Sequence, residues 1–243
     1  MNVFITGGSK GIGRAIALRF AEQGNHIFIN YAHDDQAAIE TASEIKKCGA
    51  IPHTLKADVG QVKEIHQMLK VIRSTVDQLD LIVHCAIAPI AGGVFDVSSE
   101  EWLRAVQISL SLIEVARESL PLLKDGSTII ALSSRGATNA LRSYAAIGSP
   151  KALTESIVRY LVLELAPLGV RVNVVAPGDL YTEAYHQAFP NAEEQLCRAI
   201  AATPDKKTLT FDDVTDTIAF LASPQARMIQ GRVIPVDGGL FIK

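Results

Sequence analysis

Short apolar runs alternate along the chain with longer stretches whose apolar residues recur at a helical period. The runs lie at 3–6, 26–30, 52–58, 79–86, 127–134, 170–177 and 232–237, and several are apolar throughout, as strands covered on both faces are. The amphipathic stretches lie near 11–23, 35–48, 60–77, 99–123, 150–166 and 211–222. This order predicts an α/β fold with a doubly wound parallel sheet of about seven strands, of the Rossmann type.

One segment interrupts the alternation. Residues 178–209 separate the sixth predicted strand from the last predicted helix, and long insertions in compact domains are usually lids or binding loops and otherwise disordered. Because this segment would follow the carboxyl end of a strand, where such sheets bind ligands, we expect a substrate lid at 178–209. No linker, repeat or low-complexity stretch divides the chain, so residues 1–243 are predicted to form a single domain.

Charge and composition exclude several classes of function. The net charge is −3 and no basic run occurs, which gives no support to binding of nucleic acid or a membrane surface. No apolar stretch reaches the roughly 18 residues of a membrane span. Cys48, Cys85 and Cys197 are odd in number and scattered, which favours a reducing compartment. Since a strand begins at once, without a charged leader, we expect no signal peptide and a cytoplasmic protein.

The first predicted strand leads into a glycine-rich loop. Gly7, Gly8, Gly11 and Gly13 follow "VFIT", and the amphipathic stretch "RAIALRFAEQG" follows the loop. Glycines let the backbone approach a pyrophosphate closely, and the next helix offers free N–H groups and the positive end of its dipole. Glycines alone often serve turns, but the strand before them and the helix after them predict a nucleotide site.

The spacing T-G-x-x-x-G-x-G resembles the short-chain dehydrogenase/reductase family. Further matches are "ADV" at 57–59, "LSS" at 132–134, Lys151, "VRVNVVAPG" at 170–178 with Thr182 after it, and "VDGG" at 236–239. The resemblance implies an NADP(H)-binding Rossmann domain in which Asp58 and Val59 flank the adenine, Thr182 holds the nicotinamide carboxamide and Lys151 binds the ribose. Without a cofactor, Asp58 would be a solvated side chain and Thr182 a helix cap. The expected cofactor-binding residues are Gly7, Ser9, Lys10, Gly11, Ile12, Gly13, Asn30, Tyr31, Ala32, Asp58, Val59, Cys85, Ala86, Lys151, Pro177, Gly178, Leu180 and Thr182.

The end of the second predicted strand bears on the choice of cofactor. An acid there accepts hydrogen bonds from the ribose 2′-OH of NAD and repels a 2′-phosphate, but this chain has the neutral Asn30. Lys10, inside the glycine loop, could supply positive charge to a phosphate. Asp34 and Asp35 lie farther along and act against it. On balance the sequence favours NADPH as the cofactor.

The catalytic tyrosine of the family is displaced in this chain. Most members place it four residues before the lysine and a serine 13 residues earlier, which here correspond to Ile147 and Ser134. Isoleucine cannot donate a proton, and Tyr144 offers a replacement. Seven helical residues turn about 700°, which would bring Tyr144 within about 20° of Lys151 on one face. However, Pro150 fits best in a first helical turn capped by Ser149, which would leave Tyr144 just before the helix.

Tyr-x6-Lys is the arrangement of enoyl-acyl-carrier-protein reductases, a branch of the same family. "VHCAIAP" at 83–89 and Ser109 in "VQISLS" are also similar to that branch, and the chain resembles its bacillus-type, NADPH-dependent members. Hydride would be delivered to C3 of a conjugated thioester, and Tyr144 would hydrogen-bond the enolate oxygen. Lys151 would anchor the ribose and lower the pKa of the tyrosine. Ser134 would either contact the substrate or complete a strand end.

Other residues carry weaker expectations. His84 and Cys85 are neighbours on a strand and are expected to be buried wall residues; the six histidines show no ligand spacing, so no metal is predicted. Tyr181, Tyr185, His186 and Phe189 would line an acyl pocket or form a lid hinge.

Three functions therefore remain open. The first is NADPH-dependent reduction of trans-2-enoyl thioesters on acyl carrier protein, in fatty acid elongation. The second is a 3-oxoacyl or other carbonyl reductase, or a pathway-specific ene-reductase. The third is a catalytically silent nucleotide-binding protein. The family resemblance also implies a homotetramer.

Overall fold

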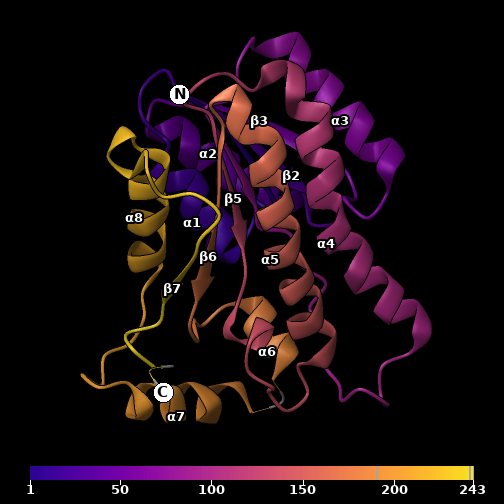
Figure 1. Ribbon diagram of the computed structural model, residues 1–243, viewed down its shortest axis with the longest axis vertical. Helices are drawn as coiled ribbons and strands as arrows, with labels where there is room; N and C mark the ends of the chain where they lie inside the picture. The colour runs from indigo at the N-terminus through magenta and orange to yellow at the C-terminus, as the bar shows by residue number, and fades with distance from the viewer. Residues whose placement is uncertain (190, 241, 243) are drawn as a thin grey trace.

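The seven strands form one parallel sheet in the order β3-β2-β1-β4-β5-β6-β7 (Figure 1). The computed structural model describes residues 1–189, 191–240 and 242. The strands are β1 (Asn2–Thr6), β2 (His26–Tyr31), β3 (Ile51–Lys56), β4 (Leu81–His84), β5 (Thr128–Leu132), β6 (Arg171–Pro177) and β7 (Val233–Val236). Every strand predicted from the sequence forms, with ends within about two residues of the expected ones. The doubly wound Rossmann-type fold is confirmed.

Helices cover both faces of this sheet. They are α1 (Gly11–Arg19), α2 (Asp35–Lys47), α3 (Val62–Thr75), α4 (Ser99–Ser119), α5 (Ala145–Leu165), α6 (Glu183–Ala188), α7 (Ala192–Ala202) and α8 (Phe211–Ala222). Short 3₁₀ turns η1 (Leu120–Leu122), η2 (Arg135–Ala137), η3 (Ala166–Leu168) and η4 (Pro224–Ala226) lie between them. The helices α6 and α7 lie beyond the lower end of the sheet in Figure 1, where β6 ends.

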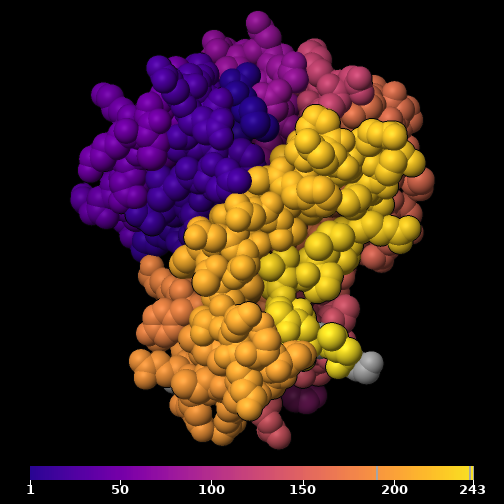
Figure 2. Space-filling model, turned by 90° about the vertical axis from the view of Figure 1, so that its left-hand side faces the viewer, coloured from indigo at the N-terminus to yellow at the C-terminus, as the bar shows by residue number. Residues whose placement is uncertain are grey.

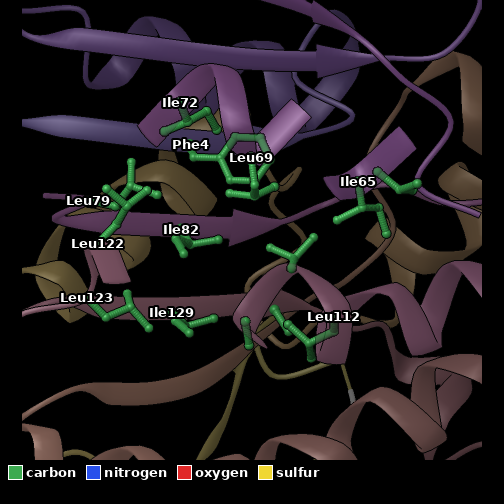
Figure 3. Packing of buried hydrophobic residues seen from close by; sticks show 14 of the residues in the cluster. Phe4, Ile65, Leu69, Ile72, Leu79, Ile82, Leu112, Leu122, Leu123 and Ile129 are labelled. Atoms are coloured by element: carbon green, nitrogen blue, oxygen red, sulfur yellow. The ribbon is translucent and has the colours of Figure 1, made fainter. Parts of the chain in front are cut away.

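The apolar character of the strands follows from this double cover. In β1, Phe4 joins the core beneath α3, α4 and α5, whereas Val3 and Ile5 join the core beneath α1, α2 and α8. Figure 3 shows Phe4 beside Leu69 and Ile72 of α3. Since successive residues of a strand face opposite sides, a strand covered on both sides needs apolar residues at every position.

In Figure 2, the C-terminal segment crosses one face between the N-terminal part and the region of α7.

Strands β1 and β4 are neighbours at the centre of the sheet, and the strand order reverses between them. The loops that follow these two strands therefore lead away to opposite faces, and a crevice forms at the carboxyl edge between them. In folds of this kind ligands bind at that point. The glycine loop follows β1 and lies directly there.

The start of α5 differs from the sequence prediction. The helix begins at Ala145 rather than at 150, Tyr144 rather than Ser149 is the N-cap residue, and Pro150 lies inside the helix. The backbone N–H of Gly148 donates to the Tyr144 carbonyl at 2.8 Å, so the turn before Pro150 is already helical. This early turn packs so closely on η2 that a Cβ on Gly148 would lie 2.5 Å from the Gly136 carbonyl oxygen. Tertiary packing thus overrides the usual preference of proline for a first turn.

The segment 178–209 is also more ordered than a simple loop, because it contains α6 and α7. Among the described residues, no helix combines the length and the apolar character needed to cross a bilayer.

Candidate active site

The glycine loop joins β1 to α1 with little space to spare. A Cβ added to Gly13 would collide with the carbonyl oxygen of Gly7, so only glycine allows the first turn of α1 to lie against the loop. The N-cap residue Lys10 makes no side-chain hydrogen bond to the helix. The Lys10 side chain therefore leaves the start of α1 open, and Gly11, Ile12 and Gly13 of this turn line the cavity, where a helix terminus can receive an anionic group.

A cavity of about 550 Å³ opens at this edge of the sheet. Its lining includes every residue that the sequence analysis assigned to the cofactor or to the chemistry. These are Gly7, Ser9, Lys10, Gly11, Ile12, Gly13, Asn30, Tyr31, Ala32, Asp58, Val59, Cys85, Ala86, Ser134, Tyr144, Lys151, Pro177, Gly178, Leu180 and Thr182. The fold thus brings together residues from seven separate stretches of the chain, and the role of each residue remains a prediction.

Asn30 and Asp58 have structural partners at one end of this cavity. The Asn30 amide, 2% exposed, donates to the carbonyls of Leu55 and Ala57, and its oxygen accepts from the Gly7 N–H at 3.3 Å. Asp58 accepts a hydrogen bond from Arg104 at 2.7 Å, which helps to lower its pKa although burial opposes this. Asp58 is therefore held in place rather than simply solvated. Asn30 ties the glycine loop to β2 and β3.

Lys10 is not a free cation. Its Nζ lies 2.6 Å from a carboxylate oxygen of Asp34 and 2.8 Å from one of Glu183, the first residue of α6. Hydrogen bonds from Lys10 to these two carboxylates raise its pKa. A 2′-phosphate at this position would therefore have to compete with two acids for the same ammonium group. The sequence indicated Asp34 as a complication but gave no sign of Glu183.

Tyr144 lies at the other end of the cavity, just before α5. Its backbone is not helical, with φ −119° and ψ 10°, so the helical-face argument for its direction does not apply. Burial raises the pKa of the Tyr144 phenol, and hydrogen bonding with the Ser134 side chain acts in the opposite direction. Desolvation outweighs the other influences, which come from Ser134, Asp179 and Arg135, so the pKa of Tyr144 is raised and the expected lowering by Lys151 does not determine its direction. Ser134 caps η2 by accepting from the Gly136 N–H at 3.1 Å.

Lys151 is 6% exposed, and its Nζ donates to the Leu132 carbonyl at 2.6 Å. Burial lowers the pKa of this ammonium group, whereas Cys85 and Glu155 act to raise it. Glu155 lies one helical turn beyond Lys151, is itself buried, and accepts a hydrogen bond from Ser133 at 2.5 Å. Sequence reasoning missed Glu155, although its i,i+4 spacing from the lysine placed it on the same helix face.

Ile147, at the position where most of the family has tyrosine, is 2% exposed. It packs in a small apolar cluster with Ala188, Phe189 and Ala192 from the region of α6 and α7. The side chain therefore supports the segment that covers the cavity. It has no group that could donate a proton.

His84 is buried, as the sequence predicted, whereas Cys85 is half-buried and lines the cavity. His84 is 1% exposed, and burial lowers its pKa to about 3, so it is neutral near pH 7. Burial raises the pKa of the Cys85 thiol to about 11. The Ser111 hydroxyl donates to the Ile108 carbonyl at 2.6 Å and can therefore accept from His84 Nε2, 2.8 Å away. Within the part of the chain that the structure describes, no group of three His, Cys, Asp or Glu side chains could hold a metal ion.

The segment after β6 covers the cavity. Thr182 caps α6 by accepting from the Tyr185 N–H at 3.0 Å, which is the simpler of the two roles considered for it. Tyr185 lines the cavity, whereas Tyr181 is half exposed and meets His186 edge-on. A largely buried ion pair lies next to this segment, with Arg135 Nη2 3.1 Å from the Asp179 carboxylate. This pair was not predicted, although Arg135 directly follows the predicted strand at 127–134 and Asp179 directly follows the motif at 170–178.

A family model described as "Enoyl-(Acyl carrier protein) reductase" matches residues 7–241 of the chain. The chain belongs to the short-chain dehydrogenase/reductase family. Oxidoreductase activity with a nicotinamide cofactor is the common property of that family, and this chain shares its fold, its glycine loop and its lysine.

Two curated relatives and one solved structure differ in the reactions that their names state. The 1-cyclohexenylcarbonyl-CoA reductase of Streptomyces collinus is 32% identical over 241 residues, which cover 98% of this chain and 86% of the relative. The 3-oxoacyl-[acyl-carrier-protein] reductase FabG of Staphylococcus aureus is 30% identical over 244 residues, covering 99% and 98%. The angucycline C-6 ketoreductase LanV with bound NADP superimposes with a TM-score of 0.89 at 28% identity, covering 100% and 96%.

The short-chain reductase site described above fits a nicotinamide dinucleotide. Gly13 lets the first turn of α1 lie against the glycine loop, and the start of α1, which the Lys10 side chain does not cap, offers N–H donors to a pyrophosphate. From there the cavity extends past Cys85 and Ala86 to Lys151 and Tyr144. When bound, such a cofactor would supply hydride at the end that lies near the tyrosine.

Proposed function

We propose that this short-chain reductase uses NADPH to reduce the carbon–carbon double bond of α,β-unsaturated thioesters. The observation that carries the proposal is that Ile147 stands where most of the family has tyrosine, while Tyr144 lies three residues earlier. Tyr144 and Ile147 both line the cavity together with Lys151, but only the tyrosine carries a group that can donate a proton, and Ile147 packs against the covering segment. The compound named for the Streptomyces relative, 1-cyclohexenylcarbonyl-CoA, is itself an α,β-unsaturated thioester.

The displaced tyrosine suits this chemistry. A ketone needs its proton donor at the oxygen of the carbon that accepts hydride. In a 2-enoyl thioester hydride goes to C3, two atoms from the carbonyl carbon, so negative charge develops on an oxygen farther from the point of attack. The Tyr144 hydroxyl would donate a hydrogen bond to that oxygen, and a proton added at C2 completes the reduction. The buried Lys151 ammonium would hold the ribose.

Carbonyl reduction is the second candidate, favoured by the names of the other two similar proteins, FabG and LanV. These names fit the broader alternative, a carbonyl reductase or a pathway-specific ene-reductase, better than elongation on acyl carrier protein. Acyl carrier protein as the carrier, and assembly as a homotetramer, remain predictions from the family resemblance.

A comparison of two substrates tests the proposal. Crotonyl and acetoacetyl thioesters of coenzyme A and of acyl carrier protein would each be supplied with NADPH, and loss of NADPH absorbance followed. We expect crotonyl thioester to be reduced faster than acetoacetyl thioester by at least about 100-fold, the usual effect of one misplaced donor. Faster reduction of acetoacetyl thioester would establish the carbonyl reductase instead. NADPH binding without consumption of either substrate would support the catalytically silent protein.

The preference for NADPH depends on Lys10. Since Lys10 lines the cavity and is the cation proposed to contact the 2′-phosphate, Lys10→Glu should lower the ratio of NADPH to NADH affinity by at least about tenfold, as removal of a charge-assisted contact does. Dissociation constants from fluorescence titration with each nucleotide measure this ratio. Lys46→Glu, on the exposed side of α2, makes the same change in net charge and should leave the ratio unaltered. An unchanged ratio in Lys10→Glu would contradict the assignment.

A further inference from the structure

The ring of Tyr144 contacts two parts of the protein. It stacks on Phe189, with ring centroids 5.2 Å apart and planes inclined by 5°. It also lies against the backbone of η2, so closely that a Cβ on Gly136 would be 2.6 Å from Cδ1 and Cε1 of the tyrosine. Phe189 is 8% exposed and does not line the cavity. Phe189 therefore contacts Tyr144 but not the space that a ligand would occupy.

Phe189 is held by the segment that covers the cavity. It is the C-cap residue of α6, and Tyr185 of the same helix packs against it with ring centroids 4.8 Å apart. Asp179, in the loop that leads to α6, pairs with Arg135 of η2. The side chains of this ion pair are only 11% and 6% exposed, so the attachment between α6 and η2 is largely sheltered from solvent.

We propose that Phe189 is a positioning residue for Tyr144: by stacking on its ring, it directs the hydroxyl into the cavity only when α6 lies over the site. This inference rests on the role of Tyr144 in the proposed function. Because the backbone of Tyr144 is not helical, the restriction that a helix places on the first side-chain torsion does not apply to it. Contact with Phe189 and Gly136 removes that freedom before substrate arrives, which is the condition for an effective hydrogen-bond donor.

The same contact affects the ionisation of the phenol. The groups that act on Tyr144 are Ser134 and Arg135 of the η2 region, Asp179 of the loop before α6, and Tyr185 of α6. Burial is the largest influence and raises the pKa of Tyr144. Loss of the Phe189 ring would admit water and bring that pKa down toward its ordinary value. Because only the protonated phenol can donate, the alkaline limb of the pH–rate profile would move to lower pH.

The test combines two variants of Phe189 with Tyr144→Phe. For whichever thioester the wild type reduces, Phe189→Leu should lower kcat by about 10- to 100-fold while KM changes little, the usual effect of misplacing a catalytic group. Phe189→Tyr, which keeps an aromatic ring, should retain most of the activity. In a Tyr144→Phe background the change to leucine should have no further effect. Phe220→Leu, on the exposed side of α8, is the matched control.

Equal losses in both backgrounds, or none in the single variant, would overturn the inference. Near-ultraviolet circular dichroism of the free protein gives a readout that needs no substrate. The contribution of Tyr144, taken as wild type minus Tyr144→Phe, should disappear in Phe189→Leu. If the wild type reduced neither thioester, the proposed function would fail, but this spectroscopic comparison would still decide whether Phe189 orders Tyr144; an unchanged contribution would exclude that role.

Discussion

Replacing Tyr144 by phenylalanine is expected to lower kcat for enoyl thioester reduction by about 10²- to 10³-fold, the usual loss when one oxyanion donor is removed. The substitution deletes only the hydroxyl. The ring would keep its stack on Phe189 and its contact with Gly136, so the fold around η2 and α5 should be unaffected. Because the phenol lies at the reactive end of the cavity, the affinity for NADPH should change by less than about twofold.

Steady-state kinetics with crotonyl thioester and fluorescence titration with NADPH measure the two effects separately. Tyr160→Phe makes the same chemical change at a tyrosine of α5 that is 69% exposed, and it should leave both quantities unchanged. If Tyr144→Phe kept full turnover, the phenol would not be the donor. The displaced tyrosine would then be a structural residue of the covering segment.

The sheet could be predicted because its strands are buried on both faces. A continuous apolar run such as that at 81–83 is typical of a strand in the middle of a sheet covered by helices on both faces. The glycine loop could also be predicted, because the spacing of its glycines reflects close backbone contacts that no other residue permits. These features depend on local sequence and on burial, both of which a single sequence displays.

Contacts between distant segments could not be predicted in the same way. The early start of α5 depends on two glycines, Gly136 and Gly148, meeting across 12 positions of sequence, and local preferences at Pro150 indicated a later start. The partners of Lys10, Asp34 and Glu183, lie 24 and 173 positions away in the sequence. The ion pairs of Lys10 could therefore not be inferred from the residues near it. Burial then reversed the expected direction of the Tyr144 pKa.

The arrangement of tyrosine and isoleucine combines both kinds of information. Counting from Lys151 was enough to show that Ile147 replaces the usual donor and that Tyr144 is available. Only the structure explains why isoleucine is suitable there, because its side chain fills the apolar cluster with Ala188 and Phe189. The same cluster places Phe189 on Tyr144, so the change at one position and the stacking of the other belong to one packing arrangement.

Replacing Gly13 by alanine is expected to abolish useful cofactor binding, with the dissociation constant for NADPH rising by at least about 100-fold. The added methyl group would meet the Gly7 carbonyl oxygen, a backbone atom that cannot turn aside as a side chain would. Either α1 or the glycine loop must then move, and both carry the N–H groups that we propose bind the pyrophosphate. Overpacking of this kind also costs about 1–3 kcal/mol of folding free energy.

Two measurements separate loss of binding from loss of folding. NADPH titration gives the affinity, and urea denaturation of the free protein gives the free energy of unfolding. Gly24→Ala is a suitable comparison, because Gly24 has a φ of +83° but open space around it. That variant should lose stability through backbone strain alone and keep its affinity for NADPH. If Gly13→Ala bound NADPH like the wild type, the pyrophosphate could not lie at the start of α1, and the orientation assigned to the cofactor would be wrong.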